Sequence, residues 1–76
     1  MGGNAAEHGG PHTQALRRAL RDVRDEAEAA DLLFLEFWQR QPTLDVAATL
    51  RASQIRRANP QLAADIHAEL TARPAR

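Results

Sequence analysis

The sequence contains no cysteine, no lysine and no tyrosine, and its only aromatic residues are two phenylalanines and one tryptophan. The absence of cysteine excludes disulfide bonds and thiolate metal sites. The longest apolar run covers residues 32–35, whereas a membrane-spanning helix needs about 18–20 apolar residues. We therefore expect a chain that neither crosses a membrane nor is held together by covalent cross-links.

Large apolar side chains are also scarce, because 16 of the 33 apolar residues are alanine. A chain of 76 residues forms one small domain at most. In domains below roughly 70–80 residues, a single core rarely supplies more than about 3–5 kcal/mol of stability. With disulfides excluded, a partner chain is the most direct source of additional buried surface.

Neither sign of charge is in excess, since ten arginines balance ten acidic residues. A net charge of zero argues against a protein whose main task is to coat nucleic acid or an anionic membrane. It leaves room for a local basic face. The use of arginine without lysine, in a chain rich in alanine, is most simply explained by the codon bias of a GC-rich genome.

The two ends of the chain lack the composition of a folded segment. Residues 1–12 hold all four glycines and are predicted to form a disordered tail. The same stretch has neither the basic nor the apolar region of a secretory signal, so we expect a cytoplasmic protein. Residues 73–76 are predicted to be a frayed end.

Apolar spacing predicts an all-α fold in which residues 13–72 form one domain of three helices, over 13–40, 44–57 and 60–72. Thr13 is a candidate N-cap, and neither glycine nor proline follows until Pro42. A parallel coiled coil and an antiparallel bundle both fit the first helix. Its apolar residues recur at alternating spacings of four and three, as in a coiled-coil seam: Leu16, Leu20, Val23, Ala27, Ala30, Phe34 and Phe37.

Local signals set the ends of the two shorter helices. Pro42 ends the first helix, and Thr43 is a candidate N-cap of the second. Asn59-Pro60 is the clearest signal, because asparagine is a preferred N-cap and proline a preferred first residue. The third helix carries an apolar stripe of Leu62, Ile66 and Leu70, with Ala63 beside it. The first helix also carries opposite charges one turn apart, at Arg18–Asp22, Arg21–Asp25, Arg24–Glu28 and Glu36–Arg40.

All three aromatic residues fall in one segment of the first helix, residues 31–38. Only Asp31 and Glu36 break its apolar circumference, and a helix that is apolar nearly all round is buried on more than one side. Two short helices cover one side, so the other is expected to meet a second chain. The alternative is that they fold back and bury everything within one chain. The predicted interface comprises Leu33, Phe34, Phe37 and Trp38, with Leu32 and Leu35 on the other side of the helix.

This segment predicts a non-catalytic helical protein–protein interaction module, such as a small adaptor, regulator or chaperone-like subunit. Aromatic side chains supply the most contact area per residue in interfaces. We expect a homo-oligomer, with a dimer as the first choice, or a complex with a heterologous protein. No cofactor is expected.

A small dimeric helix-turn-helix regulator that binds DNA is the alternative. In that arrangement the first helix forms the dimer arm, and the two shorter helices read the DNA. Asp65 and Glu69 oppose it, because acids on a recognition helix repel phosphate. The residues available for phosphate and base contacts are Arg51, Gln54, Arg56, Arg57 and Gln61.

Metal binding and catalysis find little support in the sequence. His8 and His12 are four residues apart, a spacing that brings ligands together only on a helix. Residues 9–11 are Gly-Gly-Pro, which precludes a helix there. Ser53 is the only serine and has no histidine near it in the sequence. Neither a metal site nor an enzymatic activity is expected.

Overall fold

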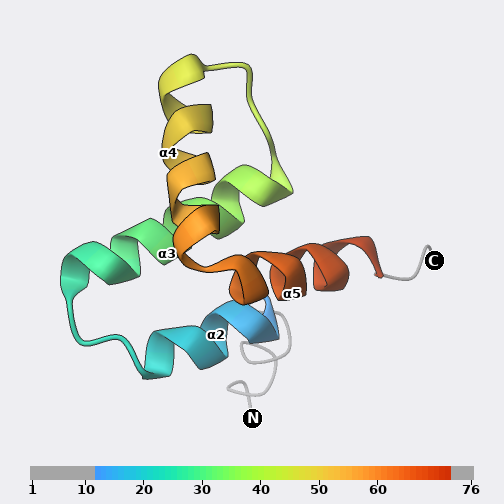
Figure 1. The fold of residues 1–76 in the computed structure, drawn as a ribbon. Helices are drawn as coiled ribbons and strands as arrows, with labels where there is room; N and C mark the ends of the chain where they lie inside the picture. Colours follow the sequence, from blue (N-terminus) through green and yellow to red (C-terminus); the bar gives the residue numbers. More distant parts are fainter. Residues whose placement is uncertain (1–11, 73–76) are drawn as a thin grey trace, which may run out of the picture.

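The computed structural model describes residues 12–72. Apart from His12, the predicted tail and the predicted frayed end lie outside this range. The described part is all-helical, as predicted, but it contains four helices instead of three (Figure 1). None of them is long and apolar enough to cross a membrane. They are α2 (Gln14–Arg21), α3 (Glu26–Arg40), α4 (Val46–Ala58) and α5 (Pro60–Thr71).

The predicted first helix over 13–40 is wrong, because residues 22–25 divide it into α2 and α3. The N–H groups of Asp22 and Val23 donate to carbonyls three residues earlier, at 3.1 and 3.2 Å, which tightens and ends α2. Asp25 then caps α3, since its Oδ1 accepts from the N–H of the second residue of that helix at 3.2 Å. Aspartate favours such caps over helix interiors.

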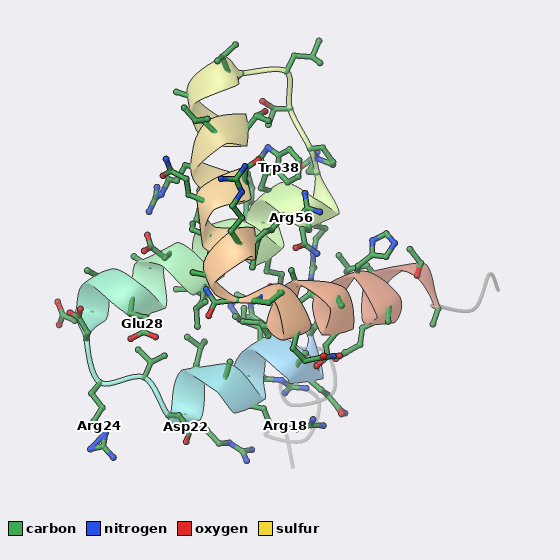
Figure 2. All side chains as sticks on the ribbon, in the orientation of Figure 1. Arg18, Asp22, Arg24, Glu28, Trp38 and Arg56 are labelled. Carbon is green, nitrogen blue, oxygen red and sulfur yellow. The ribbon has the colours of Figure 1, made fainter. Side chains whose placement is uncertain are left out.

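This break removes the coiled-coil seam that the spacing predicted. Ala27 and Ala30 are exposed, so no line of buried residues runs along 16–37. Arg24 lies in the connecting segment and points away from Glu28 (Figure 2). Of the four predicted pairs of opposite charges, only Glu36–Arg40 forms within the described residues. α2 turns back instead and packs beside α3 and α5 (Figure 1).

The core lies where α2, α3 and α5 meet. Its three fully buried large side chains are Leu16, Leu35 and Ile66, one from each of these helices. α4 packs against α3 and α5 and adds Ile55 to this core. The predicted stripe of α5 is confirmed, with Ile66 and Ala63 buried and the two leucines packed half-buried against the core.

α4 begins two residues later than predicted. Asp45, rather than Thr43, is its N-cap, and its Oδ2 accepts from the N–H of Ala48 at 3.2 Å. The Thr43 hydroxyl accepts from the N–H of Asp45 at 2.8 Å and so stabilises the turn just before the helix. Leu44, just before the helix, is 98% exposed.

The prediction that α5 begins at Pro60 is confirmed, and the helix ends at Thr71. Asn59 occupies the cap position, but its side chain makes no capping bond to α5. Its Nδ2 donates instead to the carbonyl of Ile55 at 3.0 Å. The junction between α4 and α5 is therefore one residue long and hydrogen-bonded back onto α4.

The N-terminus of α2 is held by two carboxylates from other helices. The N–H of Thr13 donates to Glu36 Oε2 at 2.6 Å, and the next two N–H groups donate to Glu69 Oε1 and Oε2 at 2.9 and 2.7 Å. The fourth donates to the Thr13 hydroxyl at 3.1 Å, which confirms Thr13 as the N-cap. All the first-turn donors that a helix leaves unpaired are thereby satisfied. We refer to Glu36 and Glu69 as the carboxylate clamp.

Glu36 is the more deeply buried of the two clamp residues, with 3% of its surface exposed. It also accepts from His12 Nδ1 at 2.7 Å and lies 3.5 Å from the Arg40 guanidinium. Burial by itself raises the pKa of Glu36. Hydrogen bonds from the N–H and hydroxyl of Thr13 and from His12, with the charge of Arg40, outweigh this effect and hold the pKa below its ordinary value of 4.5.

Removing the cap that starts α3 provides a first test of the break. We expect Asp25→Ala to lower the free energy of unfolding by about 1 kcal/mol, because an N-terminal donor of α3 loses its partner. Urea denaturation followed by circular dichroism measures this. Asp22→Ala is the control, since an acid at the C-terminus of α2 interacts unfavourably with the helix dipole. Equal losses in the two variants would contradict the role of Asp25 as a cap.

Candidate functional site

The predicted interface residues of α3 divide between the core and the surface. Leu32 and Leu35 are buried between α3 and its neighbours, so they lie in the core rather than on an exposed surface. Leu33 and Phe37 lie one turn apart on the outer face of α3, and 58% of the Phe37 surface is exposed. We call Leu33 and Phe37 the α3 patch.

Phe34 and Trp38 are only half-buried, because α4 lies beside them. The Arg51 guanidinium of α4 stands 4.4 Å from the centroid of the Phe34 ring, within the range of a cation–π contact. Arg51 also pairs with Asp31 at 3.0 Å. The face of Phe34 toward α4 is therefore used within the chain.

A second apolar surface lies at the start of α4. Leu44, Val46 and Leu50 are all exposed, and Val46 and Leu50 are one turn apart on the helix. We call these three residues the α4 patch. Their exposure follows from the direction of α4, whose first turns extend away from the other helices (Figure 1).

The residues predicted for DNA contacts do not all border one hollow. Arg51 and Gln54 border a hollow that also contains the acids Glu28 and Asp31. Arg56 and Arg57 border a different hollow, with Trp38. The remaining residue, Gln61, donates through Nε2 to Asp65 at 2.9 Å.

The hollow bordered by Trp38, which we call the Trp38 hollow, lies between the end of α3, the second half of α4 and the start of α5. Its volume is about 760 Å³. Trp38 of α3 and Arg56 of α4, both labelled in Figure 2, border this hollow. The fold also brings Ser53 and His67 to this hollow, a proximity with no local signal in the sequence.

Ser53 and His67 border the same hollow, but no hydrogen bond joins them within the described residues. Residues 12–72 contain no group of three or more histidine, aspartate or glutamate side chains placed to hold a metal ion. Of the two histidines that are four residues apart in the sequence, His8 lies outside the described residues, and His12 binds Glu36.

No family model, curated protein or solved structure matches this chain. The case for a function therefore rests on the exposed side chains and the hollows described above.

Proposed function

We propose that this chain is a non-catalytic helical interaction module that self-associates as a homodimer. The observation that carries this is the exposure of five large apolar side chains in the α3 and α4 patches. A domain with few large apolar residues loses much of its possible stabilisation when these five side chains stay outside the core. The cytoplasmic location is part of the same proposal.

The charge of the chain favours a second copy as the occupant of these patches. Its net charge is zero, so two copies do not repel each other as a whole. Neutral domains with exposed apolar surface tend to associate. In a two-fold symmetric dimer, each contact made by the α3 patch occurs twice, which doubles its contribution to the free energy of association.

We expect Phe37→Asp to abolish self-association at concentrations where the unchanged chain is dimeric. Burial of a phenylalanine is worth roughly 1.5–3 kcal/mol, and two copies are lost per dimer, so the dissociation constant rises by about a hundredfold or more. Sedimentation equilibrium over a range of concentrations measures this. Leu50→Asp tests the α4 patch in the same way.

Two controls separate apolar burial from charge. Ala68→Asp adds the same charge to an exposed position of α5, away from both patches, and is expected to leave association unchanged. Arg21→Ala removes an exposed charge from α2 and is expected to matter little. A chain that stays monomeric at high micromolar concentration rejects the homodimer. Association that Arg21→Ala weakens as much as Phe37→Asp does rejects the apolar mechanism.

The helix-turn-helix alternative has less support. Its turn joins two helices through three or four residues, whereas only Asn59 separates α4 from α5. Arg51 is engaged by Asp31 and Phe34, which leaves Arg56 and Arg57 as the basic pair. A mobility shift with duplex DNA at low salt that is lost in the Arg56→Ala, Arg57→Ala double variant would favour it over the interaction module.

A further inference from the structure

The Trp38 hollow differs in charge from the hollow that Arg51 and Gln54 border. Arg56, Arg57 and His67 border it, and none of its lining residues is acidic. The hollow that Arg51 and Gln54 border includes both Glu28 and Asp31. The field in the Trp38 hollow is therefore positive, in a chain whose net charge is zero.

Its two arginines are available to a ligand. Arg40 lies against Glu36 and Arg51 against Asp31, but Arg56 and Arg57 form no ion pair among residues 12–72. Both lie in the last turn of α4 and are exposed. A guanidinium group offers a planar set of donors that matches a carboxylate or a phosphate, so neighbouring arginines favour an anionic group.

The rest of the lining is mostly apolar, with Ser53 and Gln39 as its other polar members. It includes the Trp38 indole of α3 and Pro60 and Ala64 of α5. The volume of about 760 Å³ falls within the range of roughly 300–1,000 Å³ for small-molecule sites. Such a shape suits a compact ring system that carries an anionic group, rather than a bare ion.

The elements around the hollow are fixed before any ligand binds. Gln39 Nε2 donates to the carbonyl of Ala63 at 3.1 Å and ties the end of α3 to α5. The single-residue junction holds α4 and α5 together, because the Asn59 side chain and N–H donate to the carbonyl of Ile55 at 3.0 and 2.9 Å. A site that needs no rearrangement loses less affinity to ordering.

Two polar atoms beside the hollow lack partners. The Nε1–H of Trp38 and the Oε1 of Gln39 are buried and make no hydrogen bond within the described part. Both residues line the Trp38 hollow. Unpaired buried polar groups are unfavourable, and in native structures such a group is often paired with a bound water or ion.

We propose that the Trp38 hollow is a binding site for a small aromatic acid, in which Arg56 and Arg57 hold the carboxylate or phosphate and Trp38 packs against the ring. This site is separate from the α3 and α4 patches, so the binding proposal does not depend on self-association. No covalent step is involved.

Trp38 is the only tryptophan of the chain, so its indole fluorescence and its single indole N–H signal in a nitrogen–proton correlation spectrum report on the hollow directly. Titration with phenyl phosphate and with benzoate is expected to move both signals saturably. Benzyl alcohol, which has the ring without the charge, and inorganic phosphate, which has the charge without the ring, are each expected to bind at least about tenfold more weakly.

The arginine pair is tested by the double variant Arg56→Ala, Arg57→Ala, which is expected to weaken phenyl phosphate binding by at least about tenfold. The double variant Arg18→Ala, Arg21→Ala removes the same charge from α2 and is expected to leave the affinity unchanged. Equal losses in the two double variants, or benzyl alcohol binding as tightly as phenyl phosphate, would overturn the proposal. So would binding that leaves both Trp38 signals in place. Circular dichroism verifies that each variant is folded.

Discussion

Leu35→Ala is expected to remove most of the stability of this domain, lowering the free energy of unfolding by about 2–5 kcal/mol. Leu35 is completely buried where α3 meets α2 and α5, in a small core whose other large buried side chains are Leu16, Leu32, Ile55 and Ile66. A cavity there removes contacts from every side. Because a core of this size supplies only about 3–5 kcal/mol in total, the variant approaches complete unfolding.

Urea denaturation followed by circular dichroism and by Trp38 fluorescence measures this loss. Ile66→Val is a milder variant, expected to lower the free energy of unfolding by about 0.5–1.5 kcal/mol, which keeps the core testable if Leu35→Ala fails to fold. Leu50→Ala is the surface control, since Leu50 is 58% exposed, and a change within about 0.5 kcal/mol is expected. A loss for Leu50→Ala as large as that for Leu35→Ala would contradict the assigned core.

The all-helical class, the start of α5 and the cap of α2 were predictable because each depends on neighbouring residues. Thr13 and the Asn59-Pro60 pair mark helix starts through the bonds and angles of their own backbone. Ile66 and Ala63 are buried because the stripe on α5 follows the helical period. In such places local preference and tertiary packing favour the same conformation.

The break after α2 was not predicted, because an unbroken apolar spacing of four and three also fits one straight helix. A local signal was present, since Asp25 followed by Glu28 has the spacing of a capping box. Nothing in the spacing itself shows that the break is favoured. It is favoured by tertiary structure, because only a chain that turns back at residues 22–25 brings Leu16 against Leu35 and Ile66.

The candidate sites were also predictable only where they depend on neighbouring residues in the sequence. The sequence located the aromatic segment of α3, but not which of its faces remains exposed, because that depends on where α4 crosses. Ser53 and His67 are joined with Trp38 only by the tertiary arrangement of three helices. Glu36 was expected to interrupt an apolar surface, whereas its carboxylate caps a helix 23 residues earlier in the chain, a contact with no local signature.

Glu36→Gln is expected to lower the free energy of unfolding at neutral pH by about 1.5–3 kcal/mol, the range for hydrogen bonds to a charged group. The Glu36 carboxylate accepts from the Thr13 N–H and from His12 Nδ1, one donor on each oxygen. A glutamine amide has only one acceptor oxygen, so one of these donors faces an NH₂ group instead. Glu28→Gln, at an exposed position of the same helix, is the control and is expected to change the stability little.

The pH dependence of this difference identifies the carboxylate as its cause. The pKa of folded Glu36 lies below its ordinary value of 4.5, so the unfolded chain binds the proton more readily. The contribution of Glu36 is therefore complete above that ordinary value and is lost as the pH falls through the lower pKa of the folded state. Urea denaturation across the acid range is expected to show the unchanged chain and Glu28→Gln losing this stability together. The difference from Glu36→Gln should shrink over the same range, and a constant difference would show that the clamp acts through packing rather than through charge.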